Sequence, residues 1–170
     1  MRTPKAILAL ATVGALVTLG LTVDSAPAAP VSANPCTAIT PRALDDYARL
    51  IGTAHRFAST DASKFGSSGK YAVAATNSRD QLKRAQDRAE AAARDLRASN
   101  PSVTTPAEAG TVKEHVRFIL ELVPQAAHWA IISEIYHDSP DARKAFDESV
   151  KVLEQGNVLY AESGRCYMEL

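Results

Sequence analysis

The residues with the most evident chemical potential lie in one short stretch, Glu134-Ile135-Tyr136-His137. In a helix, the three-residue spacing places the carboxylate of Glu134 and the imidazole of His137 on one face. Ferritin-like di-iron bundles use two such Glu-x-x-His pairs and two further glutamates. This sequence offers a single pair, so Glu134 and His137 are metal ligands only in an alternative hypothesis. The simpler interpretation is a histidine favoured by the negative end of a helix.

Aromatic residues in the same region suggest a second kind of site. Trp129 and Tyr136 are seven residues apart and therefore share a helix face. Together with His128 they could line a pocket for haem or another flat apolar ligand, or form a surface patch that contacts a partner. His128 and His137 point in opposite directions, so one helix face cannot supply two opposed axial ligands to haem.

The dipeptide His137-Asp138 resembles the His-Asp pair of secreted phospholipases, in which the histidine activates water and the aspartate helps to hold calcium. The resemblance covers two residues, and neither the additional cysteines nor the calcium-binding loop of that family is evident in this sequence. It implies a third hypothesis, a hydrolase in which His137 and Asp138 act on the reacting water.

Composition favours helices and argues against a nucleic-acid partner. The chain has 170 residues, of which 46% are hydrophobic and only 6% aromatic, and alanine is abundant. Such a composition favours close-packed helices, because strands use β-branched and aromatic residues. The formal net charge is zero, and without residues 1–28 it is near −1, which provides no long-range attraction for polyanions.

Residues 1–28 have the features of a signal peptide. Arg2 and Lys5 precede an uncharged apolar run from Ile7 to Val23, and Ala26-Pro27-Ala28 offers the small residues that a signal peptidase recognises. The alternative is a retained anchor, because a run of about 17 residues is borderline for spanning a bilayer. We therefore expect a secreted, extracellular or cell-envelope-associated protein without stable membrane insertion after cleavage.

Cys36 and Cys166 are the two cysteines of the chain. In an exported protein, two cysteines near opposite ends of the mature chain are expected to form a disulfide, with free thiols or an intermolecular bridge as the alternative. Two single cysteines so far apart do not form a zinc-binding pattern.

Helix start signals divide the mature chain into four helical segments. Residues 29–39 are rich in proline and are expected to be extended. A capping residue followed by proline predicts helix starts at Thr40-Pro41, Thr105-Pro106 and Ser139-Pro140. A further helix is expected from about Tyr71 to Ala98.

Each segment carries an apolar stripe at steps of three and four residues. We expect the first helix to fade near Ser59 and the last to stop at Ser163-Gly164, while Ile135 should widen the third stripe. The predicted stripes are Leu44, Tyr47, Ile51, Ala54 and Ala58; Tyr71, Ala75, Ser78, Leu82, Ala85, Ala89, Ala92 and Leu96; Val112, Val116, Ile119, Val123, Ala126 and Ala130; and Phe146, Val150, Leu153, Leu159 and Tyr160.

These signals predict an all-α fold in residues 40–170, an antiparallel up-down-up-down four-helix bundle with a third helix kinked at Pro124. The Cys36–Cys166 disulfide would join its termini. The leading functional hypothesis is an exported, non-enzymatic binding or interaction module without a cofactor, whose partner is an unknown protein or envelope component. A small-ligand, metal or haem carrier is the alternative. The sequence leaves the oligomeric state open.

Overall fold

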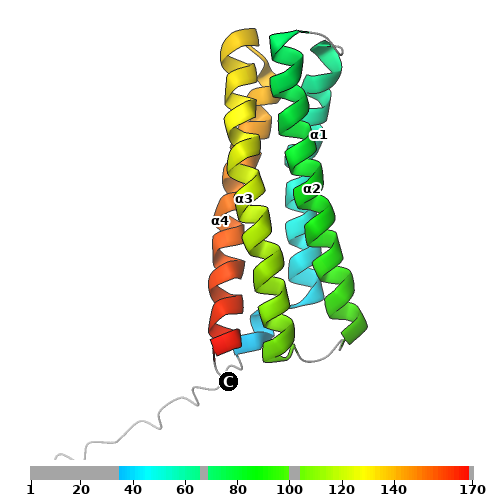
Figure 1. Cartoon of the computed structure of the whole chain (residues 1–170), viewed down its shortest axis with the longest axis vertical. Helices are drawn as coiled ribbons and strands as arrows, with labels where there is room; N and C mark the ends of the chain where they lie inside the picture. The colour runs from blue at the N-terminus through cyan, green and yellow to red at the C-terminus, as the bar shows by residue number, and fades with distance from the viewer. Residues whose placement is uncertain (1–34, 66–68, 100–103, 169–170) are drawn as a thin grey trace, which may run out of the picture. The chain divides into compact units, whose positions relative to one another are not determined.

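The computed structural model describes residues 35–65, 69–99 and 104–168, which belong to the compact unit formed by residues 32–170. These residues form four long helices and one short 3₁₀ turn, and no strand occurs among them (Figure 1). Each helix packs against its neighbours in sequence, and α1 packs against α4 to close the ring. The predicted up-down-up-down bundle is confirmed. The elements are η1 (Pro35–Ala38), α1 (Pro41–Phe65), α2 (Lys70–Ser99), α3 (Pro106–His137) and α4 (Pro140–Met168).

Three of the helices begin at the predicted caps. The Thr40 hydroxyl accepts a hydrogen bond of 3.1 Å from the backbone N–H three residues later, and Ser139 does the same at 3.3 Å. Thr105 and Glu108 form a capping box, in which each side chain accepts a hydrogen bond from the other residue's backbone N–H. These bonds satisfy donors that a helix start otherwise leaves unpaired.

Most of the predicted apolar stripes form the core. All residues of the first and third stripes are buried, and so are all residues of the second stripe except Tyr71. The prediction was wrong for Ile135 and Val150, which are 68% and 37% exposed. Serines occupy the inward positions instead, because Ser133 and Ser149 continue the three- and four-residue steps of the buried rows.

Two predicted helix ends were also wrong. Instead of fading near Ser59, α1 continues to Phe65, because its next inward residues still reach buried partners. The expected stop at Ser163-Gly164 does not occur, and α4 continues to Met168. The Ser163 hydroxyl donates a hydrogen bond of 2.7 Å to the Leu159 carbonyl one turn earlier, so this polar side chain is satisfied within the helix.

The predicted disulfide is present and joins the two ends of the bundle. Cys36 in η1 bonds to Cys166 in α4, with 5.2 Å between their Cα atoms, and both pack against Ala109 of α3. Residues 35–38 of the segment expected to be extended form a 3₁₀ turn instead, because Cys36 must approach α4. Residues 29–34 of that segment and the predicted signal peptide lie outside the described residues. A disulfide of this kind is typical of an oxidising compartment.

Helix α3 continues without interruption through Pro124, which has no backbone N–H to donate within the helix, so the kink at this position stays a prediction. Pro124 itself is exposed, which leaves room for its ring on the outer face of the helix. Within the described ranges, none of the helices is both long and apolar enough to cross a membrane.

We expect removal of the disulfide to lower the free energy of unfolding by about 2–5 kcal/mol, because the unfolded chain regains the freedom that a 130-residue closure removes. Urea unfolding of wild type with and without reductant measures the difference. The Cys36→Ser/Cys166→Ser double variant is the control and should not respond to reductant. Equal stabilities of the oxidised and reduced wild type would contradict this expectation.

The two glycines of α4 lie in contrasting surroundings. A Cβ atom at Gly156 would meet the Tyr47 hydroxyl and would lie 2.9 Å from Leu120 Cδ2, whereas a Cβ atom at Gly164 would lie no closer than 3.7 Å to Lys113. We therefore expect Gly156→Ala to destabilise the bundle by about 1–3 kcal/mol through overpacking. Gly164→Ala is the matched control and should stabilise by up to about 1 kcal/mol, the usual helix preference. Denaturant midpoints of the two variants should shift in opposite directions.

Candidate functional site

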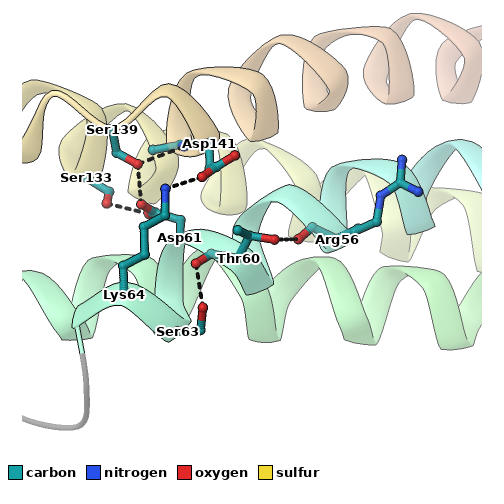
Figure 2. Close-up of polar contacts among 9 residues, drawn as sticks. Arg56, Thr60, Asp61, Ser63, Lys64, Ser133, Ser139 and Asp141 are labelled. Atoms are coloured by element: carbon teal, nitrogen blue, oxygen red, sulfur yellow. Dashed lines mark hydrogen bonds and ion pairs between the residues drawn. The ribbon is translucent and has the colours of Figure 1, made fainter.

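A buried carboxylate links three helices at the end of the bundle opposite the disulfide. Asp61 of α1 is only 2% exposed. Its two oxygens accept hydrogen bonds from the hydroxyls of Ser133 in α3, at 2.6 Å, and Ser139 before α4, at 2.5 Å (Figure 2). Burying a carboxylate is costly unless such donors replace water. These two hydrogen bonds to Asp61 therefore fix the positions of the end of α3 and the start of α4 relative to α1.

The connection between α3 and α4 is short and tightly held. Asp138 adopts a left-handed conformation, with φ 46° and ψ 47°, and its N–H donates to the Glu134 carbonyl at 2.8 Å. Ser139 serves both as the cap of α4 and as a donor to Asp61. An ion pair between Lys64 and Asp141 lies beside this network in Figure 2. The last turn of α3 is thus held in a defined orientation.

Four rings meet at this end of the bundle. The imidazole of His137 lies between Phe65 of α1 and Tyr71 of α2, with ring centroids 4.2 Å and 4.3 Å away. The Tyr71 ring also contacts Tyr136, at 5.3 Å between centroids. His137 Nε2 is buried, and in the described structure it has no hydrogen-bond partner. The ring of His137 therefore acts here mainly as a packing element.

The outer surface next to these rings is apolar and partly exposed. Ile135, Tyr136 and Tyr71 are 68%, 62% and 37% exposed. Trp129 and Ile132 are half-buried and precede Tyr136 at spacings of seven and four residues, which places all three on one helix face. We call Trp129, Ile132, Ile135 and Tyr136 of α3 with Tyr71 of α2 the aromatic band.

The predicted metal ligands turn toward different helices. Glu134 pairs with Arg143 of α4 at 3.7 Å, whereas His137 packs between rings of α1 and α2. In residues 35–65, 69–99 and 104–168, no group of three or more His, Cys, Asp or Glu side chains could hold a metal ion. The structure therefore does not bring Glu134 and His137 together with a third ligand.

The other predicted site residues lie on the same part of α3. His128 is exposed, and its ring lies 5.7 Å from that of Trp129. Tyr136 belongs to the aromatic band as an exposed residue rather than as the wall of an enclosed pocket. Asp138, the second residue of the His-Asp dipeptide, is the exposed cap of α3. These residues form an outer surface.

Sequence reasoning missed the parts of this site that depend on contacts between helices. The sequence predicts Tyr71 in the core because it continues a stripe of alanines, yet Tyr71 contacts Tyr136 and His137 at the surface. Asp61 is absent from the predicted first stripe, although it follows the buried Ala58 at the three-residue step of that stripe. An acidic residue at an inward position was the available signal.

We expect Asp61→Ala to lower the free energy of unfolding by about 2–4 kcal/mol, because it removes the acceptor of two buried hydroxyl donors. Asp46→Ala is the matched control, since Asp46 is an exposed α1 aspartate paired with Arg49, and it should cost at most about 1 kcal/mol. Urea unfolding monitored by circular dichroism provides both values. Equal effects of the two substitutions would mean that the buried network stabilises the fold no more than an exposed ion pair does.

Comparison with known proteins provides no family for this chain. No protein-family model, no curated protein and no solved structure matches it.

Proposed function

We propose that this protein is a non-enzymatic binding module whose contact surface is the aromatic band. The single observation that carries the proposal is the exposure of Ile135, Tyr136 and Tyr71 at one end of a disulfide-bonded bundle, where the rings of Tyr71 and Tyr136 are in contact. Large apolar side chains exposed together on a protein surface are characteristic of interaction sites. Tyrosine and tryptophan also dominate the binding energy of many protein interfaces.

The chemistry of the band favours a protein partner. Tyr71 and Tyr136 offer apolar ring faces as well as hydroxyl groups that can form hydrogen bonds with a polar rim. Polar groups border the band, including the Glu134–Arg143 ion pair and the exposed His128. An apolar centre with a polar edge is the usual anatomy of a protein–protein interface. The near-zero net charge argues against a polyanion.

The proposed place of action is outside the cytoplasm, in the extracellular space or the cell envelope. The charged start, apolar run and small residues at the beginning of the chain support export. The Cys36–Cys166 disulfide supports an oxidising environment. Its buried sulfurs would persist there as a structural crosslink.

The proposal is tested by replacing Tyr136 with the photoreactive p-benzoylphenylalanine in the oxidised protein. Irradiation in extracellular and envelope fractions of the host should give one discrete adduct, and excess wild-type protein should compete it away. The same replacement at Val158, which is 49% exposed on α4, is the control and should give no such adduct.

A charge placed in the band should abolish the interaction. We expect Ile135→Asp to weaken partner capture by at least about tenfold, because a carboxylate would have to be desolvated in the interface. Val158→Asp is the matched exposed control and should leave capture unchanged. Equal adduct yields at residues 136 and 158, or full capture by Ile135→Asp, would refute the aromatic band as the contact surface.

A further inference from the structure

Helix α2 contributes less to the core than its length suggests. Its buried apolar residues are Leu82, Leu96 and seven alanines. Among the described residues, the large half-buried side chains that pack against the core come from the other three helices, for example Phe57 of α1, Phe118 of α3 and Phe146 of α4. Because alanine buries little area, α2 gains less hydrophobic stabilisation from its neighbours than a helix of larger side chains would.

Helix α2 also takes no part in the buried polar network. The buried hydrogen bonds between elements in the described structure join Asp61 to Ser133 and Ser139, and Thr104 to the Ile39 carbonyl. The side-chain hydrogen bonds that join α2 to other helices lie at the surface, as between Gln81 and Gln125 at 3.2 Å. Ser78 of α2 is buried, and among the described residues its hydroxyl has no hydrogen-bond partner. An unsatisfied buried hydroxyl disfavours the packing of α2 against the other helices.

A small hollow, partly open to solvent, lies in the interface between α2 and α3. A cavity of about 60 Å³ lies between Ala92 and Leu96 of α2 and Val112 and His115 of α3. Nδ1 of His115 is buried and has no hydrogen-bond partner within the described ranges. At this hollow fewer side chains join α2 to α3, and a buried nitrogen without a partner further weakens their attachment.

His115 is one of two histidines that face α2 from opposite sides. Burial and then the nearby Arg88 of α2 lower the pKa of His115, while Asp95, whose carboxylate lies 3.7 Å from Nε2, acts in the opposite direction. Glu108 on its own helix also lines the cavity, and Glu114 and Arg117 line the adjoining surface hollow. When α2 is packed in place, the neutral form of the His115 imidazole is therefore favoured more strongly than in a histidine exposed to water.

His55 of α1 lies within reach of the charged side chains on the other side of α2. Its Nε2 lies 3.2 Å from the Ser59 hydroxyl. Burial lowers its pKa first, followed by Lys83 and Arg79 of α2, and these effects outweigh the opposing ones of the two acidic residues facing it, Asp87 and Asp80. Movement of α2 away from α1 would expose the imidazole to water and remove both cations.

The sign of the pH dependence follows from these two groups. Each histidine has a lower pKa in the closed bundle than its ordinary value of 6.5, so the open state binds more protons. The packing of α2 against α1 and α3 is therefore most stable above about pH 6.5, and its stability falls progressively as the pH drops below that value. The disulfide and the Asp61 network tie the other three helices together, so the stability lost is that of the α2 contacts.

We propose that α2 is an acid-releasable helix, which separates from α1 and α3 on mild acidification while α1, α3 and α4 remain together. This inference goes beyond the proposed function and does not depend on it. Tyr71 belongs to α2, whereas Tyr136 belongs to α3. If the aromatic band is the contact surface, acidification would divide that surface and release the partner.

Hydrogen exchange measured by mass spectrometry on the oxidised protein tests the inference. Between about pH 7.5 and about pH 5.5, protection factors corrected for intrinsic exchange should fall by about tenfold or more in residues 74–96. Those in α4 should stay unchanged. The His55→Gln/His115→Gln double variant has no titrating imidazole at either position, so its α2 should keep nearly the same protection at both pH values.

Matched controls distinguish this mechanism from a general effect of acid. His128→Gln removes an exposed imidazole and should preserve the full response of wild type. If the double variant folds poorly, as judged by circular dichroism at neutral pH, each single variant should still reduce the response. The inference is overturned if α2 and α4 lose protection together, if the double variant responds like wild type, or if His137→Gln alone abolishes the response through its contact with Tyr71.

Discussion

The carboxylate of Asp61 is the interaction on which the organisation of this bundle depends. It is buried where α1, α3 and the start of α4 meet, and its two oxygens are satisfied by the hydroxyls of Ser133 and Ser139. A buried charge accepts few alternative arrangements, because any displacement leaves it without donors. It therefore holds the connection between α3 and α4, and with it the last turn of α3, which presents Tyr136.

The two ends of the bundle are stabilised by different physical means, and α2 takes part neither in the disulfide nor in the Asp61 network. A covalent bond between Cys36 and Cys166 joins the first and last elements at one end, and the Asp61 network joins α1, α3 and α4 at the other. Helix α2 is held by its buried alanines and two leucines, by the ring contacts of Tyr71, and by ion pairs at the surface such as that of Arg97 with Asp45. Exposed pairs of this kind contribute little. The disulfide and the buried polar network thus link α1, α3 and α4, whereas α2 has neither kind of link.

Of the candidate site, the sequence alone identified Trp129 and Tyr136 as residues sharing one face, because helical spacing is a local property. It could not identify Tyr71 as their neighbour, since that contact joins the start of α2 to the end of α3. The Glu134-x-x-His137 spacing suggested a shared ligand face. In the structure, Arg143 and the rings of Phe65 and Tyr71 draw these two side chains toward different helices.

For the fold, the sequence by itself determined the helices, their starting caps, the buried stripes and the pairing of the cysteines. Each of these follows from local spacing or from the chemistry of a few residues. Only the tertiary structure decided that α1 and α4 extend past their predicted ends, that Ser133 and Ser149 take inward positions in place of Ile135 and Val150, and that Asp61 is buried. The physical reason is that Asp61, Ser133 and Ser149 are stable in the core because a partner from another helix or from the preceding turn satisfies them, and such partners are set by the tertiary structure.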